Sequence, residues 1–342
     1  MKVFLPFKPV ENTYLFEIEN HFQGVFSYGD FNAYNNDYHI VNIHWPEAMF
    51  SWKEPTIQQL KDLEVTLKTW KKHSKLIYTR HNEIPHYNQT ENYKKLYEIV
   101  IKLADGIIHL GEYSLNQFTQ ETETKHVVIR HPLYLSIPNE ISKNEARKIL
   151  GISDKAKVIL VFGKIRSKEE NQLIFNSFKG LKISNKVLLI PSMQYFLSNK
   201  IPRKLLVLLR YLMKAYYKLH SNYCLKNEFV KTENIQNYFN ASDIVFIPRV
   251  TGLNSGNLFM GLTFNRVVVG PNIGNIKNIL NNLGFPIFKT NNADSVVESI
   301  SKGFSISENG FENKVNKEQL IEYNSEVVSK QYFNFFKTIL NE

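Results

Sequence analysis

The sequence lacks the features of several protein classes. It has one cysteine, Cys224, among 342 residues, which excludes a disulfide framework and a cysteine-rich zinc site. No apolar run approaches the roughly 18 residues that cross a bilayer, and the apolar stretch after Met1 is too short for a signal peptide. We therefore expect a cytoplasmic protein. With 43% hydrophobic and 22% charged residues the chain is globular, so disorder and coiled coil are excluded.

Several chemical motifs are also missing. No G-x-G-x-x-G follows the first predicted strand, which argues against a standard dinucleotide-binding fold. The absence of G-x-x-x-x-G-K-[ST] excludes a P-loop nucleotidase, and the chain has no G-x-S-x-G nucleophile elbow. It also has no H-x-x-x-H or H-E-x-x-H helix, which argues against a metal site built on a histidine pair.

The charge is strongly basic. The 42 lysine and arginine residues outnumber the 32 aspartate and glutamate residues, and the net charge is +10. A basic protein attracts nucleic acid, anionic lipid or a polyphosphate ligand. The lysines are spread over predicted helices and no nucleic-acid motif is recognisable, so we expect no nucleic-acid partner and keep a nucleic-acid-binding protein only as a less favoured alternative.

Short apolar runs alternate with amphipathic stretches along the whole chain. The first half predicts strands at residues 3–7, 38–43, 76–79, 106–110 and 126–129, with helices at 12–22, 56–72, 91–103 and 114–120. After a turn-rich segment at 136–155 the pattern restarts, with strands at 157–162, 186–190, 243–247 and 267–269. Helices are predicted at 143–150, 172–181, 203–218, 234–240, 255–263, 293–303 and 325–340. This order predicts an α/β fold of two Rossmann-like halves, each a parallel sheet covered on both faces.

Ligands of open parallel sheets bind beyond the carboxyl ends of the strands, and in the first half these ends carry histidine. His44, His81, His109 and His131 lie at the ends of four predicted strands, and His86 shares the loop of His81. Nine of the ten histidines lie within the first 131 residues. Imidazoles in a cleft can hydrogen-bond sugar hydroxyls or phosphate, and metal binding is a less favoured alternative.

In the second half the strand ends carry glycine and basic residues. Three loops follow strands there, and their site candidates are Gly163, Lys164 and Arg166; Arg249, Asn254, Ser255, Gly256 and Asn257; and Gly274. Glycine lets the backbone approach a ligand closely, and a helix N-terminus opened by serine and glycine is a candidate anion site. Three such loops at one edge favour a diphosphate.

Six segments have a recognisable order and spacing. They read N-T-Y-L at 12–15, T-R-H-N-E-I-P-H at 79–86, A-D-G-I-I at 104–108, F-G-K-I-R at 162–166, A-S-D-I-V-F-I-P at 241–248 and N-S-G at 254–256. Together they resemble the GT-B glycosyltransferases, in particular the group 1, family 4-like enzymes of bacterial polysaccharide assembly. The resemblance implies an acceptor-binding domain at 1–140, a nucleotide-sugar donor domain at 141–324, and a C-terminal helix at 325–342 that packs back on the first domain.

The chain departs from the family pattern where the donor would bind. The two positions of the family's E-x7-E read Gly252 and Met260, and Lys168 is followed by Glu169 and Glu170 where the family has its lysine. The contact to the donor ribose and the choice between retention and inversion therefore stay open. No convincing D-x-D motif is present, so we expect a metal-independent enzyme whose only cofactor-like ligand is the nucleotide-sugar co-substrate.

The resemblance implies a hexosyltransferase that moves a sugar from a nucleotide diphosphate to a saccharide or lipid-linked saccharide. A sugar-nucleotide epimerase of the same fold is the alternative, although the second half offers few acid/base pairs. Fixed cations and backbone N–H groups would stabilise the leaving diphosphate, and in an inverting enzyme a general base would take the acceptor proton.

The site residues follow from these roles. The predicted catalytic residues are His81, His86, Glu47 and Glu83. The predicted donor-binding residues are Gly163, Lys164, Arg166, Arg249, Asn254, Ser255, Gly256, Asn257 and Gly274. The predicted acceptor-binding residues are His44, Trp45, Asn82 and His109. If the imidazole of His81 is the base, kcat/KM should fall below a pKa near ~6.5.

The predicted helix at 203–218 has an unusual composition. Residues 201–221 contain five basic side chains and no acidic one, interleaved with leucine and tyrosine. Such a helix either packs against the core with a solvated basic face or lies on an anionic membrane surface. A peripheral position on the inner membrane face is therefore the alternative to a purely cytoplasmic one.

Overall fold

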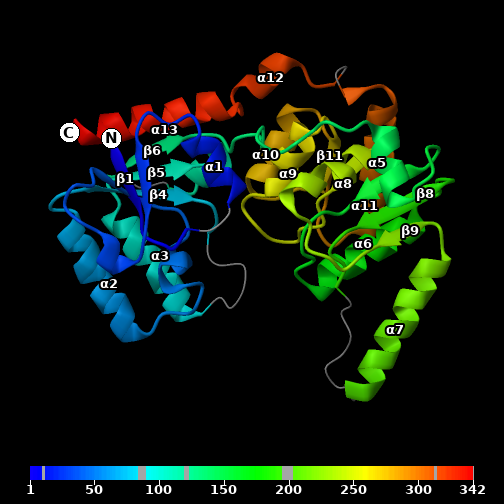
Figure 1. Ribbon diagram of the computed structural model, residues 1–342, viewed down its shortest axis with the longest axis horizontal. Helices are drawn as coiled ribbons and strands as arrows, with labels where there is room; N and C mark the ends of the chain where they lie inside the picture. Colours follow the sequence, from blue (N-terminus) through cyan, green and yellow to red (C-terminus); the bar gives the residue numbers. More distant parts are fainter. Residues whose placement is uncertain (10–11, 84–89, 119–122, 195–202, 312–313, 342) are drawn as a thin grey trace. The chain divides into compact units, whose positions relative to one another are not determined.

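The computed structural model describes residues 1–9, 12–83, 90–118, 123–194, 203–311 and 314–341 (Figure 1). The chain divides into two compact units. The first contains Met1–Tyr134, Gly252–Asn254 and Leu320–Glu342, and the second contains Leu135–Thr251 and Ser255–Gln319. The sequence predicts domain boundaries after residues 140 and 324. In the structure the corresponding boundaries lie a few residues earlier, after Tyr134 and Gln319.

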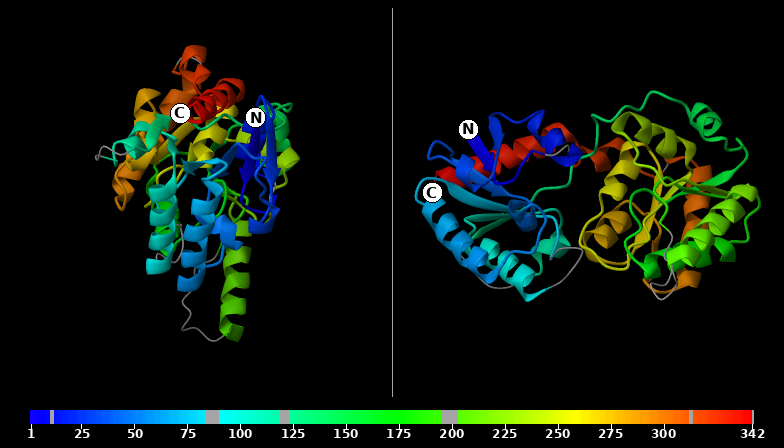
Figure 2. Two further views of the ribbon diagram at one scale, coloured as in Figure 1. Left: turned by 90° about the vertical axis from the view of Figure 1, so that its left-hand side faces the viewer. Right: turned by 60° about the horizontal axis from the view of Figure 1, so that its bottom comes forward.

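The first unit is built on a six-stranded parallel sheet with the order β2-β1-β3-β4-β5-β6. Its strands are β1 (Lys2–Leu5), β2 (Val25–Tyr28), β3 (Ile40–Ile43), β4 (Lys75–Arg80), β5 (Gly106–His109) and β6 (Lys125–Val128). Its helices are α1 (Thr13–Glu19), η1 (Phe31–Ala33), η2 (Pro46–Phe50), α2 (Ile57–Trp70), α3 (Glu91–Leu103), α4 (Glu112–Leu115) and α13 (Ser325–Leu340). Helices α2 and α3 lie on one side of this sheet and α13 lies on the other (Figures 1 and 2).

Helix α2 shows how the sequence builds one of these layers. Thr56 and Gln59 form a reciprocal capping box that starts the helix. Its apolar side chains then recur at helical spacing, and Leu60, Leu63 and Leu67 are buried in one cluster with residues of α3 and the sheet. Burying each such side chain contributes about 1.5–3 kcal/mol relative to leaving it exposed.

The C-terminal helix α13 packs on α1. Ser329 Oγ donates a hydrogen bond to the carbonyl of Ile18 at 2.8 Å, and the hydroxyls of Tyr332 and Tyr14 lie 2.7 Å apart. Tyr332 and Phe336 are fully buried. The last helix therefore completes the core of the first unit, although its residues follow the second unit in the sequence.

The second unit contains another six-stranded parallel sheet, with the order β12-β11-β10-β7-β8-β9. Its strands are β7 (Lys157–Leu160), β8 (Lys186–Ile190), β9 (Tyr223–Leu225), β10 (Ile244–Phe246), β11 (Val267–Pro271) and β12 (Ile287–Phe288). Its helices are α5 (Lys143–Leu150), α6 (Lys168–Gly180), α7 (Arg203–Leu219), η3 (Thr232–Asn234), α8 (Ile235–Ala241), α9 (Gly256–Thr263), α10 (Gly274–Asn282) and α11 (Ala293–Glu308), and α12 (Lys317–Ile321) spans the change of unit. The chain runs outward from β7 in one direction and from β10 in the other, so these neighbouring strands form the switch point where open sheets bind ligands.

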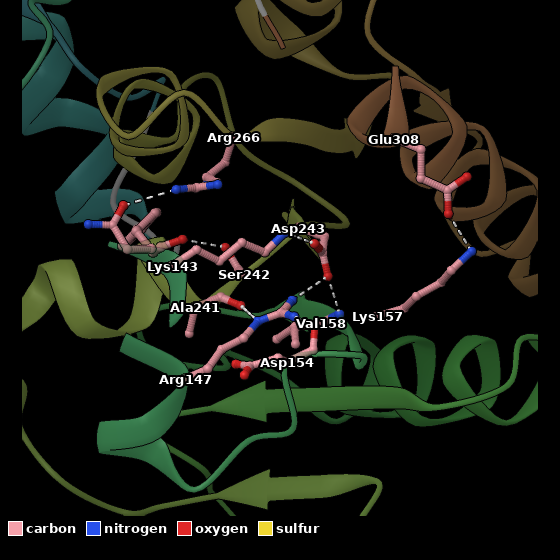
Figure 3. Close-up of polar contacts among 12 residues, drawn as sticks. Lys143, Arg147, Asp154, Lys157, Val158, Ala241, Ser242, Asp243, Arg266 and Glu308 are labelled. Atoms are coloured by element: carbon pink, nitrogen blue, oxygen red, sulfur yellow. Dashed lines mark hydrogen bonds and ion pairs between the residues drawn. The ribbon is translucent and has the colours of Figure 1, made fainter. Parts of the chain in front are cut away.

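An aspartate before a central strand has the same role in both units. Asp243 precedes β10, and its Oδ2 accepts hydrogen bonds from the N–H of Val158 at 2.6 Å and from Arg147 at 3.0 Å (Figure 3). Asp105 precedes β5, and its Oδ2 accepts from the N–H of Leu76 on β4 at 2.7 Å. The A-D-G and A-S-D segments therefore tie neighbouring strands together at their amino ends, away from the edge where ligands bind.

Candidate functional site

The carboxyl end of the first sheet carries a cluster of buried rings. His44 follows β3, His81 follows β4, and both side chains are buried. Trp45 stacks on His81 with ring centroids 4.5 Å apart, and Tyr14 makes edge contacts with His81 and His131, each at 4.7 Å. The structure therefore brings the predicted residues His44, Trp45 and His81 together at one edge of this sheet.

A chain of hydrogen bonds fixes the proton positions on two of these imidazoles. Thr79 Oγ1 donates to Asn42 Oδ1 at 3.1 Å, so the amide nitrogen of Asn42 faces His44 Nε2, at 2.9 Å, and can only donate. A neutral His44 then carries its proton on Nδ1 and donates to His81 Nε2 at 2.9 Å. His81 consequently carries its own proton on Nδ1. In this tautomer His81 is a donor, and its Nε2 can take up a proton only if the bond from His44 breaks.

The same chain reaches the C-terminal helix. The Tyr332 hydroxyl donates to Thr79 Oγ1 at 3.4 Å and lies 2.7 Å from the Tyr14 hydroxyl. Tyr14 on α1 and Tyr332 on α13 therefore position the hydroxyl of Thr79. This hydroxyl orients the amide of Asn42, and the amide in turn determines the tautomers of His44 and His81.

Burial keeps the imidazoles of this cluster neutral. Loss of solvent lowers the pKa of His44 and that of His131 to about 3. It lowers the pKa of His81 well below its ordinary range, and the neighbouring imidazoles lower it further. The sequence suggested that His81 is a base with an ordinary imidazole pKa. In the structure the ring stays neutral through that pH range, so we expect no fall of kcat/KM near pH ~6.5 from His81.

The predicted carboxylates lie in different surroundings. Glu47 is buried in η2, and its Oε2 accepts a hydrogen bond from the Tyr97 hydroxyl at 2.8 Å. Burial raises the pKa of Glu47, and hydrogen bonds partly oppose this rise. Glu83 is exposed and accepts a hydrogen bond from the Gln117 amide. His86, the fourth predicted catalytic residue, lies outside the described residues.

His109, at the end of β5, belongs to a second cluster. Its Nδ1 lies 2.8 Å from Ser114 Oγ, and its Nε2 lies 2.9 Å from His126 Nδ1. Arg80 also donates to Ser114 Oγ, at 3.1 Å. His109 is fully buried, and burial lowers its pKa to about 3. The contact of His109 with Ser114 holds the start of α4. Asn82 lies on the loop after β4 and is half-buried, and its role in acceptor binding stays a prediction.

In the second unit the predicted glycine and basic residues follow β7 and β10 at the switch point. Gly163 has a φ of +79°, a conformation that favours glycine. Asn257 Nδ2 donates to the carbonyl of Phe162 at 2.6 Å, and this bond joins the loop after β7 to helix α9. Lys164 is exposed and Arg166 is half-buried. The structure thus brings Gly163, Lys164, Arg166 and Asn257 to one edge of this sheet.

Arg249 is buried and holds this loop in place. Its Nη1 donates to Glu170 Oε2 at 2.6 Å, and its Nη2 donates to the carbonyl of Lys164 at 3.2 Å. The same oxygen of Glu170 accepts from the backbone N–H of Arg166 at 2.7 Å. Because Glu170 matches the charge of Arg249, the observed role of Arg249 is to position the loop, and direct contact with a donor stays a prediction.

Two consecutive helices begin at this edge without a side-chain cap. Ser255 is the N-cap of α9 and Ile273 that of α10, and neither side chain makes a capping hydrogen bond. Neither helix has an acidic residue in its first turn, and α10 starts with the predicted Gly274 at a φ of +50°. Ser142 and Ser167, by contrast, cap α5 and α6 with their side chains. The first N–H groups of α9 and α10 therefore suit an anion.

The remaining predicted donor residues lie on either side of the N-cap of α9. Gly256 is the first residue of this helix and is exposed. Asn254 groups with the first unit, where its Nδ2 donates to the carbonyl of His81 at 2.8 Å. This contact ties Asn254, on the loop between β10 and α9, to the backbone of His81, and its predicted contact with the donor stays a prediction.

The histidines of the first unit are paired with polar neighbours. Within the part of the chain that the structure describes, no three histidine, cysteine or acidic side chains gather as metal ligands. His44 bonds to Asn42 and His81, and His109 bonds to Ser114 and His126. These contacts use both ring nitrogens of His44 and His109 in a protein network.

Sequence analysis missed several residues that build these edges. Asn42 is a fully buried polar side chain inside the apolar strand β3, and this exception to the strand pattern was a usable signal. Glu170 lies four residues after Arg166, in the first turn of α6, and was noted only as a departure from a family pattern. Tyr332 gave no local signal, because its partner Tyr14 is at the other end of the chain.

Solved structures resemble the whole chain, although no protein-family model and no curated protein matches it. HepE from Anabaena, in complex with UDP, shares 10% identity at a TM-score of 0.71 over 98% of this chain and 99% of that chain. A glycosyltransferase from Rickettsia africae shares 14% identity at a TM-score of 0.68 over 100% of this chain and 98% of that chain. Sucrose-phosphate synthase from Thermosynechococcus elongatus shares 12% identity at 0.62, over 89% and 74%.

These structures define the class of fold. They are GT-B glycosyltransferases, and the chain has the GT-B fold, with two Rossmann-like units that each contain a parallel six-stranded sheet. The fold class predicted from the sequence is confirmed. Similarity to HepE extends over both units, because it covers 98% of the chain.

Proposed function

We propose that the protein is a glycosyltransferase that takes a sugar from a nucleotide diphosphate bound at the switch point of the second unit. The observation that carries the proposal is the pair of helices α9 and α10, which begin there without a side-chain cap or an acidic first turn. The loop with Lys164 and Arg166 follows the neighbouring strand β7. Helix N-termini and cations together suit a diphosphate.

The ligands of the structural neighbours support this proposal. HepE was crystallised with UDP, with UDP and glucose, and with UDP-glucose. A starch synthase of the same fold was crystallised with ADP and acarbose. A uridine or adenosine diphosphate sugar is therefore the first donor to test on this chain.

The proposed chemistry depends on stabilising the leaving diphosphate. Negative charge grows on the diphosphate as the bond to the sugar breaks, and donors already in place stabilise it without reorganisation. Arg249 and Glu170 hold the backbone of the loop that supplies Lys164 and Arg166. In the first unit, His81 offers a neutral N–H donor at Nδ1, which suits a sugar hydroxyl.

The finer parts of the proposal concern the transferred group and the acceptor. We propose transfer of a hexose, without a metal ion, to a saccharide or lipid-linked saccharide of bacterial surface polysaccharide. Metal independence is tested directly by measuring turnover with and without EDTA, because an enzyme that needs Mg²⁺ would lose its activity.

The donor site is tested by binding and turnover. We expect uridine or adenosine diphosphate sugars to raise the midpoint of thermal unfolding, because a ligand that binds only the folded state stabilises it. Arg166→Ala should lower kcat by about 10²–10³, the scale of one lost oxyanion donor. Lys179→Ala is the matched control, because Lys179 is an exposed cation at the other end of α6, and it should leave kcat unchanged.

Two outcomes would contradict the proposal. A native rate in Arg166→Ala would exclude this loop from the reaction. Conversion of the nucleotide sugar to its epimer in the absence of any acceptor would identify an epimerase instead.

A further inference from the structure

Helix α7 concentrates exposed apolar side chains. Of the 17 exposed large hydrophobic side chains in the described residues, seven belong to this one helix. None of its described side chains is buried. Helices between parallel strands ordinarily cover a face of the sheet, but α7 extends away from the sheet of its unit (Figures 1 and 2). No described helix of the protein is long and apolar enough to cross a membrane.

The C-terminal end of α7 attaches it to the second unit. The ring of Tyr217 lies 4.9 Å from that of Tyr223 on β9 and 5.5 Å from that of Phe175 on α6. The half-buried residues of the helix are Leu206, Leu209, Met213, Ala215 and Tyr217, and all of them except Ala215 lie on the side of the helix that carries Tyr217. The remaining surface of α7 faces solvent.

A second apolar stripe on α7 is exposed. Its residues are Leu205, Leu208, Leu212, Tyr216 and Leu219, with exposed fractions of 45, 51, 53, 53 and 84%. They are spaced by three or four residues, so they lie along one side of the helix. At about 1.5 Å per residue the stripe is roughly 20 Å long.

The charge of α7 is of one sign. The helix contains five basic residues and no acidic one. Arg210, Lys214 and Lys218 are spaced by four residues and form a row, and Lys214 lies about 200° around the helix from Leu212. Apolar residues on one side and lysine or arginine on the other are typical of helices that lie in a membrane interface.

We propose that α7 docks the protein on an anionic lipid surface, with the Leu205–Leu219 stripe at the acyl-chain boundary and the row of basic residues among the headgroups. Long lysine and arginine side chains can bury their stems beside the leucines and keep their charges in water. A second copy of α7 is a poorer occupant, because pairing would bring ten basic residues together with no acid. The proposal goes beyond the proposed function and holds whether or not the protein transfers sugar.

The first test measures binding of the full chain to vesicles by sedimentation. Vesicles of phosphatidylcholine with about one third phosphatidylglycerol should bind the protein, and vesicles of phosphatidylcholine alone should not. Binding should fall in about 1 M salt, where the Debye length is roughly 3 Å. Equal binding to both kinds of vesicle, or to neither, would overturn the proposal.

Two double variants separate the charge from the apolar stripe. Lys214→Gln with Lys218→Gln should weaken binding on the order of 30-fold, about fivefold for each charge near the surface. Leu208→Gln with Leu212→Gln should weaken binding by at least about tenfold, because two leucines lose their apolar contacts with the lipid. All four side chains are exposed, so the midpoint of thermal unfolding should stay unchanged.

Matched controls make the same chemical changes elsewhere. Lys179→Gln with Lys182→Gln removes two exposed charges from the same unit, and Ile57→Gln with Val65→Gln removes two exposed apolar side chains from α2. Both should bind vesicles nearly as the native chain does. Equal weakening in the controls and in the α7 variants would exclude α7 as the docking element.

Insertion depth gives an independent readout. The helix has no tryptophan, and all three tryptophans of the chain lie within the first 70 residues. Leu212→Trp should therefore add a signal that lipids brominated on the acyl chain quench, beyond any quenching seen in the native protein. No added quenching, or a dimer that the leucine variant abolishes while vesicles are not bound, would overturn the proposal.

Discussion

Replacing Asp243 by asparagine tests the contact that joins β7 and β10. The carboxylate of Asp243 accepts from the N–H of Val158, from Arg147 and from Lys143 (Figure 3). The side chain of Arg147 is only 2% exposed, whereas that of Lys143 is 39% exposed. The pair with Arg147 is therefore the one whose loss should destabilise the fold, because exposed ion pairs contribute little.

The magnitude follows from what asparagine retains. Breaking a buried ion pair by removing one partner typically costs about 3–5 kcal/mol. The amide oxygen of asparagine can still accept from Val158, and Arg147 keeps its hydrogen bonds to the carbonyls of Ala241 and Asp154. We therefore expect the free energy of unfolding of the second unit to fall by about 2–3 kcal/mol.

The assay uses the distribution of tryptophan. Trp45, Trp52 and Trp70 all belong to the first unit, so fluorescence reports that unit, while far-ultraviolet circular dichroism reports both. Urea unfolding should show the circular dichroism transition of Asp243→Asn at lower urea. Asp154→Asn is the matched control, because its carboxylate is exposed and only its backbone carbonyl contacts Arg147.

The reasoning would be refuted if Asp243→Asn unfolded within about 0.5 kcal/mol of the native chain, the range of an ordinary surface substitution. A fluorescence transition that moved as far as the circular dichroism transition would show that the units unfold together, and the magnitude would then apply to the whole chain.

Two further predictions concern the histidines of the first unit. Burial lowers the folded pKa values of His44 and His131 to about 3 and lowers that of His81 well below its ordinary range, whereas an unfolded imidazole titrates near ~6.5. The unfolded state then binds more protons below that pH, so stability is present above it and is lost as the pH falls, by about 1 kcal/mol per histidine between about pH 6.5 and 5.5. Urea unfolding monitored by tryptophan fluorescence should show this loss of stability as the pH falls. The control variant His73→Gln, at an exposed site, should show the same loss. A free energy of unfolding that does not change between these pH values would contradict the burial argument. For the proposed transfer, His81→Asn keeps an N–H near the position of Nδ1 and should retain more than about a tenth of the native kcat. His81→Ala lacks this donor, and its kcat should fall on the order of 10²-fold. Equal losses of kcat in the two variants would exclude a donor role for His81.

The fold could be predicted from the sequence because its central strands are largely apolar runs. The strands β1, β3, β4, β5, β7, β8, β10 and β11 all lie in such runs, which polar residues such as Asn42 in β3 and Thr79 in β4 interrupt. The three strands that the sequence did not reveal are β2, β9 and β12, and each is an edge strand of two to four residues. An edge strand has one neighbour and a partly solvated surface, so its sequence carries less of the apolar pattern.

The candidate site could be predicted only in part, for a related reason. Position after a strand is a local property, so His44, His81, Gly163 and Arg166 could be proposed from their place in the sequence. The partners that give them their chemistry are distant, as Tyr332 is from Tyr14. The pKa of a histidine depends on burial by such partners, which explains why the sequence suggested an ordinary imidazole for His81.

The carboxyl ends of the two sheets differ in their electrostatic character. At the first edge, burial keeps the imidazoles neutral and a hydrogen-bond relay orders them, so His44 and His81 are neutral donors of fixed direction. At the second edge, the charge of Arg249 is cancelled by Glu170, and positive potential comes from Lys164, Arg166 and the uncapped helices. A neutral sugar hydroxyl is recognised by direction, whereas a diphosphate is recognised by charge. In the proposed transfer, loss of Arg166 should therefore affect the leaving diphosphate, whereas loss of His81 should affect the contact with a sugar hydroxyl.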